Sequence, residues 1–148
     1  MKVTWISAVL AALFFATTGW ASESVQEQRH ELMESAKDAA KPIGGMLKGE
    51  LEFDAATAME SFQVWSDVAA QAGDLFPEGS ETGYDTEAKE TIWTDRDGFN
   101  QQLADFTAAV DGAIEASPQS LDELKMATGP VFKACKSCHE GYRVEDEN

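Results

Sequence analysis

Two cysteines and a histidine stand close together near the end of the chain, in the run Cys135-Lys136-Ser137-Cys138-His139. In a helix, positions i, i+3 and i+4 share one face, so both thiols and the imidazole project in the same direction. Thiols at this spacing can reach the two vinyl groups on one edge of a porphyrin and form thioethers, while the next side chain reaches the iron. The run therefore predicts one covalently attached haem c, held by Cys135 and Cys138, with His139 as an axial iron ligand.

Other uses of these three residues fit the sequence less well. A thioredoxin-like redox pair belongs to a βαβ context, and the sequence has no such pattern. A zinc site needs further ligands, and the chain has only these two cysteines and one other histidine, His30. A simple disulfide between Cys135 and Cys138 would leave His139 without a role.

The first 21 residues have the layout of a secretory signal peptide. Lys2 precedes a mostly apolar stretch, and Gly19 and Ala21 supply the small side chains that a signal peptidase reads. The apolar stretch is shorter than the roughly 20 residues of a membrane-spanning helix. We therefore predict a cleaved signal peptide over 1–21 and one domain over 22–148, located in the periplasm. An uncleaved N-terminal anchor is the alternative, and it too places the domain outside the cytoplasm.

The first half of the predicted domain contains two helical patterns, in which apolar residues recur at intervals of three and four. The first predicts a helix over 24–47, with a kink near Lys41 because Pro42 lies inside it. The second predicts a helix that begins after Asp54, a good N-cap, and ends at Gly73. Its expected inner face consists of Ala55, Met59, Phe62, Trp65 and Ala69.

A third helix is predicted from about Thr94, with Asp97 completing a variant capping box, to Ser117–Pro118. The residues before it, 73–93, contain Pro77, Gly79 and Gly83 and several acids, which predicts a loop. Loops of this length inside a compact domain are uncommon and are often functional.

The fourth predicted helix starts at Ser120, runs to about Tyr142 and carries the haem motif, with a bend expected at Gly129–Pro130. Four amphipathic helices in one domain of this size favour an all-α fold. The expected architecture is an antiparallel four-helix bundle with covalently bound haem.

The chain is strongly acidic, with 27 acidic and 11 basic residues and a net charge of −16. This balance excludes binding to nucleic acid or to an anionic membrane surface. It favours periplasmic redox proteins with basic docking surfaces as partners, although solubility alone is an equally good explanation of the charge. After removal of the signal peptide, no segment is expected to span a membrane.

Taken together, the chain resembles the cytochrome c′ family, the class II c-type cytochromes, which are four-helix bundles. The resemblance covers the whole region after the signal peptide. Family members form monomers or dimers through their first two helices, and the resemblance leaves a homodimer open. The resemblance to this family rests on the closing run Cys-Lys-Ser-Cys-His-Glu-Gly-Tyr-Arg, on Arg29 in the first helix, on Lys48-Gly49-Glu50, and on Asp85-Thr86-Glu87 with Ile92-Trp93.

The resemblance implies a ligand for the other side of the iron. In this family the residue four positions after the first-helix arginine faces the iron, and here that residue is Met33. Typical members have a non-ligand there and a five-coordinate, high-spin iron, whereas a smaller branch has methionine and a six-coordinate, low-spin iron. The alternative is that Met33 is an ordinary core residue. His30 is a less favoured ligand, and the family register favours none of Met46, Met59 or Met126.

The resemblance also implies haem contacts outside the motif. Arg29 is expected to pair with a haem propionate through charge-assisted hydrogen bonds. The alternative for Arg29 is a surface arginine paired with a nearby glutamate. Thr86 and Glu87 are expected to approach the haem edge from the long loop.

These expectations predict a periplasmic electron-transfer protein with low-spin haem c and His139/Met33 ligation. The alternative is a high-spin protein that binds nitric oxide or carbon monoxide at an open distal site. An enzymatic role such as peroxidase activity needs distal acid–base groups, and the helix face that carries Met33 offers none. We therefore expect no enzymatic activity.

Overall fold

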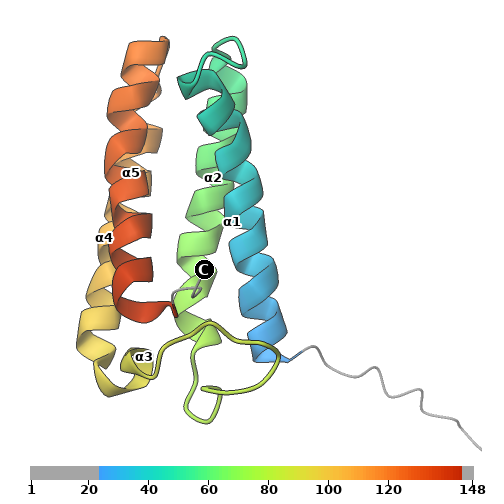
Figure 1. The fold of residues 1–148 in the computed structure, drawn as a ribbon. Helices are drawn as coiled ribbons and strands as arrows, with labels where there is room; N and C mark the ends of the chain where they lie inside the picture. The colour runs from blue at the N-terminus through green and yellow to red at the C-terminus, as the bar shows by residue number, and fades with distance from the viewer. Residues whose placement is uncertain (1–23, 145–148) are drawn as a thin grey trace, which may run out of the picture.

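Four long helices stand side by side in the computed structural model, which describes residues 24–144 (Figure 1). The predicted signal peptide lies outside the described residues. The long helices are α1 (Val25–Leu47), α2 (Ala55–Ala72), α4 (Arg96–Ala116) and α5 (Leu121–Tyr142). Short connections join α1 to α2 and α4 to α5 at one end, and a long segment crosses the other end from α2 to α4 (Figure 1). The predicted all-α four-helix bundle is therefore confirmed.

The helices begin where polar side chains can accept hydrogen bonds from the unpaired N–H groups of the first turn. Ser24, Asp54 and Ser120 cap α1, α2 and α5 in this way, the last two as predicted. For α4 the prediction of Thr94 as the cap is wrong. Thr94 belongs to a preceding helical turn, and the Oδ1 of Asp95 accepts the hydrogen bond from Gly98 N at 3.2 Å instead.

Neither proline interrupts its helix. α1 continues through Pro42 and α5 continues through Pro130, although each proline removes one backbone N–H donor. Just before Pro130, the hydroxyl of the buried Thr128 donates to the carbonyl of Leu124 at 2.8 Å, which satisfies this side chain inside the bundle. The haem motif therefore lies on a continuous helix.

The hydrophobic core fills the end of the bundle where α1 meets α2 and α4 meets α5. The expected inner face of α2 is incomplete. Phe62 and Trp65 are buried and Met59 packs against the core, but Ala58, Val68 and Ala72 are buried as well. A bundle helix touches two neighbours, so its buried face is wider than a single stripe. The core residues with the largest side chains are Ile43, Met46, Phe62, Trp65, Val110, Leu124 and Val131.

The long connection between α2 and α4 is more structured than the predicted loop over 73–93. It contains a 3-10 turn, η1 (Gly73–Leu75), and a short helix, α3 (Thr91–Thr94). Ile92 of α3 is buried, which anchors this segment to the bundle. The connection passes across the end of the bundle at which α5 terminates (Figure 1).

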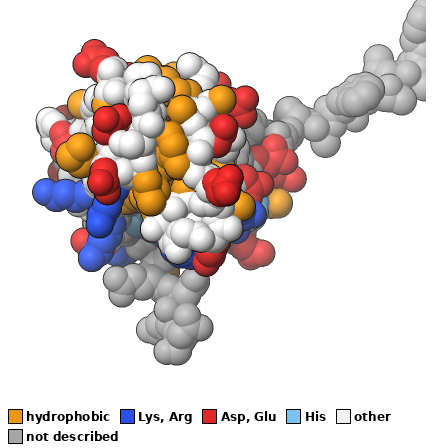
Figure 2. Space-filling view, turned by 90° about the horizontal axis from the view of Figure 1, so that it is seen from above, with side chains coloured by type: hydrophobic (Ala, Val, Ile, Leu, Met, Phe, Trp, Pro, Cys, Tyr) orange, Lys and Arg blue, Asp and Glu red, His pale blue; other side chains and the backbone are white. Residues whose placement is uncertain are grey.

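The opposite end of the bundle is drawn in Figure 2, where hydrophobic side chains gather in the middle and acidic ones are scattered around them. Leu51 and Leu121 are among the exposed large hydrophobic residues and lie at this end. Within residues 24–144, no helix combines the length and the apolar character that crossing a membrane requires.

Candidate functional site

A cavity of about 690 Å³ opens between the helices in the half of the bundle away from the core. This size falls within the range of small-molecule and cofactor pockets, about 300–1,000 Å³. All four long helices contribute to its walls, which are mainly apolar. The apolar lining consists of Met33, Ala36 and Ala40 from α1, Trp65, Val68 and Ala72 from α2, Leu103 and Phe106 from α4, and Phe132 and Ala134 from α5.

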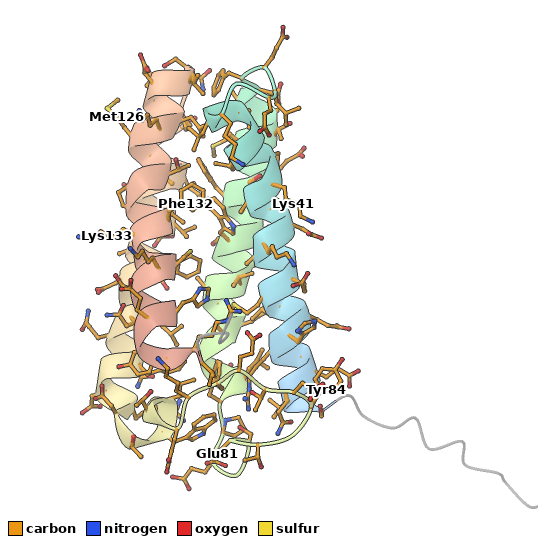
Figure 3. All side chains as sticks on the ribbon, viewed as in Figure 1. Lys41, Glu81, Tyr84, Met126, Phe132 and Lys133 are labelled. Atoms are coloured by element: carbon orange, nitrogen blue, oxygen red, sulfur yellow. The ribbon has the colours of Figure 1, made fainter. Side chains whose placement is uncertain are left out.

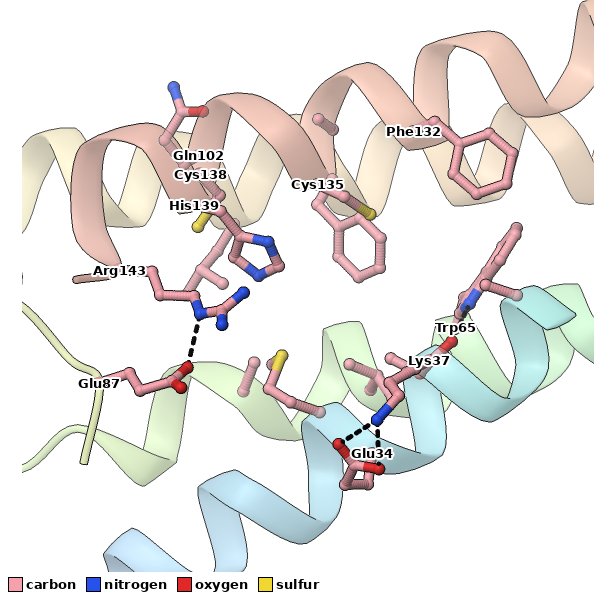
Figure 4. A pocket seen from close by; sticks show the side chains of 18 of the residues that line it. Glu34, Lys37, Trp65, Glu87, Gln102, Phe132, Cys135, Cys138, His139 and Arg143 are labelled. Carbon is pink, nitrogen blue, oxygen red and sulfur yellow. Dashed lines mark hydrogen bonds and ion pairs between the residues drawn. The ribbon is translucent and has the colours of Figure 1, made fainter. Parts of the chain in front are cut away.

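Cys135, Cys138 and His139 all line this one cavity, as Figure 4 shows. Both cysteines are free thiols and are half-buried. Burial raises the pKa of both thiols, that of Cys138 to about 11, so neither is a thiolate at neutral pH. Two free thiols and an imidazole on one wall of a deep apolar cavity fit covalently bound haem c.

The surroundings of His139 favour its neutral form. Desolvation by the surrounding protein lowers the pKa of the imidazole, and the positive charge of Arg143 lowers it further. The neutral imidazole is the form that binds metal ions, because a ring nitrogen must offer its lone pair. His139 is accessible from the cavity and is therefore available to an iron ion placed there.

Met33 lies on α1, the helix across the cavity from the haem motif. Its side chain is 39% exposed, whereas the core residue Met46 is 1% exposed. Met59 packs against the core, and Met126 is exposed and projects away from α5 (Figure 3). Of the methionines in the described residues, Met33 alone lines the cavity.

Two ion pairs belong to the polar part of the cavity wall. Arg143 Nε donates to Glu87 Oε2 at 2.5 Å, and Lys37 Nζ lies 2.8 Å from Glu34 Oε1 (Figure 4). The hydrogen bond from Lys37 lowers the pKa of Glu34, so this carboxylate stays ionised at neutral pH.

His30 also lines the cavity. Its ring is exposed and makes an edge contact with Tyr84, at 6.3 Å between ring centroids.

Arg29 and Thr86 do not line the cavity. Arg29 is 6% exposed, so the alternative of a surface arginine is wrong. Its guanidinium donates to Leu75 O at 2.6 Å and to Ser80 O at 2.7 Å, and its Nη1 lies 3.4 Å from the Thr86 hydroxyl. The ring of Phe76 lies 4.6 Å from it. The predicted contacts of Arg29 and Thr86 with haem therefore remain predictions, while Glu87 does reach the cavity.

The sequence profile described as Cytochrome C′ matches residues 24–143. The chain belongs to the cytochrome c′ family. It is 35% identical to cytochrome c′ of Rhodopseudomonas palustris over 140 residues, covering 93% of this chain and 95% of the relative. It is also 30% identical to cytochrome c-556 of the same organism over 142 residues, covering 92% and 93%. The solved structure of R. palustris cytochrome c′ matches with a TM-score of 0.81 at 35% identity, covering 84% of this chain and 99% of that one.

Members of the cytochrome c′ family are non-enzymatic haem proteins, and they bind haem c covalently through a C-x-x-C-H motif near the C-terminus. Cys135 and Cys138 occupy that place here. The relatives include both cytochromes c′ and cytochromes c-556, so family membership alone leaves the spin state of the iron open.

Some residues of this cytochrome c′ family site were missed by reasoning from the sequence. The sequence predicts Trp65 on an inner helix face but not in a cavity, and it does not identify Leu103 or Phe106 as cavity residues, because a stripe of apolar residues does not show where packing stops. Outside the cavity, the Arg29 partner Ser80 was not identified at all. It is a buried polar residue in a connecting segment, and nothing in the local pattern distinguishes it.

Proposed function

We propose that this chain is a periplasmic electron-transfer protein in which His139 and Met33 together hold a low-spin haem c. The observation that carries the proposal is the position of Met33. It is the cavity-lining methionine, it comes from the wall opposite the haem motif, and it is not packed in the core. A second iron ligand from that wall would leave no open coordination position on the iron for substrate chemistry.

Bound haem c supplies one-electron redox chemistry at its iron. His139 offers a neutral imidazole from α5. Met33 offers a thioether from α1, a soft neutral ligand that favours ferrous iron and raises the reduction potential. Because both side chains project from long helices rather than from loops, neither has to move far when an electron is gained or lost. The walls of the cavity that both side chains line are mainly apolar.

The alternative is a high-spin protein that binds nitric oxide or carbon monoxide. Ala36 and Ala40, which lie beside Met33 on the cavity wall, have small side chains. They would leave room for a diatomic ligand if Met33 did not bind the iron. The similarity to a cytochrome c′ supports this alternative.

The proposed partners are periplasmic redox proteins with basic docking surfaces. Members of this family are periplasmic in bacteria. In this chain the segment between α2 and α4 is rich in acids and crosses the end of the bundle at which the haem-motif helix terminates (Figure 1). A basic partner would be attracted to this end. The acidic residues of that segment are Asp74, Glu78, Glu81, Asp85, Glu87, Glu90 and Asp95.

Absorption spectra of the purified holoprotein, together with those of a Met33→Ala variant, test the proposal. We expect a low-spin wild-type protein with a thioether-to-iron charge-transfer band. In the Met33→Ala variant, loss of the methionine thioether should make the iron high-spin and let carbon monoxide bind fast. Met126→Ala is the matched control, because Met126 is exposed and lies outside the cavity, and it should leave the spectrum unchanged.

Two results would contradict the proposal. A high-spin wild-type spectrum would favour the gas-binding alternative. A low-spin spectrum that survives Met33→Ala would assign the second ligand to another residue. A His30→Ala variant identifies His30 as that ligand if it becomes high-spin.

A further inference from the structure

The segment 75–95 forms hydrogen bonds to the last turn of α5. Lys89 N donates to Tyr142 O at 2.9 Å, Lys89 Nζ donates to Glu140 O at 2.9 Å, and the Thr91 hydroxyl donates to Gly141 O at 3.1 Å. The last carbonyls of a helix have no partners within the helix itself. The segment therefore supplies these partners one turn after His139.

A second group of contacts reinforces this attachment. The Tyr142 hydroxyl donates to Asp95 Oδ2 at 2.8 Å, and the same carboxylate caps α4. Val144 N donates to Glu87 O at 2.7 Å, and Arg143 pairs with the Glu87 side chain. The end of the haem-motif helix is thus held by the segment both before and after its last residue.

The same segment is attached to α1 through Arg29. This side chain donates to Leu75 O, to Ser80 O and to the Ser80 hydroxyl, the last at 2.5 Å. It also lies against the rings of Phe76 and Trp93, at 4.6 and 5.5 Å from their centroids. The Ser80 hydroxyl in turn donates to Pro77 O at 2.6 Å, which fixes the local turn.

These two attachments lie beside the two proposed iron ligands. Arg29 precedes Met33 by four residues and therefore shares its face of α1, one turn away. Tyr142 follows His139 by three residues on α5. α1 and α5 flank the cavity, and at this end of the bundle the segment joins one helix to the other (Figure 1).

We propose that residues 75–95 act as a strap that fixes the separation of α1 and α5 and so keeps Met33 within reach of the iron that His139 binds. Ser80 and Thr91 are its positioning residues, on the α1 side and the α5 side respectively. The inference rests on the proposed ligation by Met33. It adds that the strap, and not the methionine alone, decides whether this ligand stays bound.

The double variant Ser80→Ala, Thr91→Val tests the strap in the holoprotein. It removes hydroxyl hydrogen bonds at both attachments, keeps the shape of both side chains close to the original, and changes no residue that lines the cavity. The control double variant is Ser35→Ala, Thr107→Val. It removes two hydroxyl-to-carbonyl bonds that stay within α1 and α4 and do not join elements.

Two measurements are made on wild type and both double variants. The first is the rate of carbon monoxide binding to the ferrous protein, together with the high-spin fraction of the ferric protein. The second is amide hydrogen exchange in the residues around Met33 and around His139. For the strap variant we expect carbon monoxide to bind about tenfold faster. This factor follows from losing the two hydroxyl hydrogen bonds that join the strap to Arg29 and to Gly141, each of ordinary net strength. Exchange should be faster in both helices, and the control should match wild type.

The outcomes separate this inference from the proposed function. A low-spin wild type with a strap variant unchanged in carbon monoxide binding overturns the strap and leaves Met33 ligation standing, whatever the exchange shows. A high-spin wild type overturns Met33 ligation. In that case faster exchange in both helices of the strap variant still supports a strap that fixes their separation, and unchanged exchange overturns it.

Discussion

The indole Nε1 of Trp65 on α2 donates a hydrogen bond to the main-chain carbonyl of Ala36 on α1 at 3.0 Å. Ala36 lies three residues after Met33 in the sequence. Trp65, Ala36 and Met33 all line the cavity. The indole also stacks on Phe62, with ring centroids 5.8 Å apart, and meets Phe132 of α5 edge-on at 5.7 Å. Trp65 therefore joins three helices at the border between the core and the cavity.

Replacing Trp65 with phenylalanine should keep an aromatic ring in this place but remove the hydrogen bond and part of the packed volume. We expect the free energy of unfolding to fall by about 1–2 kcal/mol. Guanidinium unfolding of the holoprotein measures the change. Trp93→Phe is the matched control, because its indole also donates to a carbonyl, Pro77 O at 2.9 Å, from a half-buried position in the α2–α4 connection. An equal loss in both variants would contradict a special role for Trp65.

Replacing Cys138 with serine should reduce the covalent retention of haem on denaturing gels, because only Cys135 could then form a thioether. The serine hydroxyl is close in size to the thiol, so the cavity wall is otherwise preserved. Ser137→Ala changes an exposed neighbour inside the same motif and should retain haem fully. Haem staining of the three proteins at equal loading makes the comparison. Full retention by Cys138→Ser would refute the thioether at this position.

Much of the helical framework could be predicted from the sequence because the caps and the apolar stripes are local signals. Asp54 and Ser120 cap their helices as expected. The haem motif could also be predicted from the sequence, since helical spacing alone brings Cys135, Cys138 and His139 to one face of the helix.

Other features could not be predicted because they depend on residues far apart in the chain. Glu87 and Arg143 are 56 residues apart, and they meet only because the α2–α4 connection crosses the end of α5. The burial of Arg29 has the same cause, since its partners Ser80 and Thr86 come from that connection. The 3-10 turn and α3 inside the predicted loop lack the long apolar stripe that marks a helix in sequence.

Ser117 ends α4 in a left-handed conformation, with φ 41° and ψ 60°. A residue with a Cβ pays about 1–2 kcal/mol for this conformation, whereas glycine adopts it without that cost. We expect Ser117→Gly to raise the free energy of unfolding by about 0.5 kcal/mol, after allowing for the greater freedom of glycine in the unfolded chain. Thermal unfolding of the holoprotein measures the change, with Ser117→Ala as the control that retains the Cβ. A glycine variant less stable than the alanine variant would contradict the prediction.

Asp54 gives the protein a defined pH dependence at the start of α2. Its Oδ1 accepts a hydrogen bond from Thr57 N at 2.6 Å, and this bond holds the pKa of the carboxyl below its ordinary value. A carboxyl whose pKa is lower in the folded than in the unfolded state stabilises the fold above its unfolded pKa, about 3.9. That contribution is lost as the pH falls through the folded pKa.

An Asp54→Asn variant should lose this part of the pH dependence, because asparagine caps helices nearly as well but does not titrate. We expect the difference in melting temperature between wild type and variant to shrink or reverse as the pH is lowered from about 6 to about 3, below the ordinary aspartate pKa. Melting curves at intervals across this range measure it. Asp67→Asn, at an exposed position within α2, controls for the loss of one negative charge. If the melting temperatures of wild type and Asp54→Asn change with pH in parallel, the capping carboxylate contributes nothing to acid unfolding.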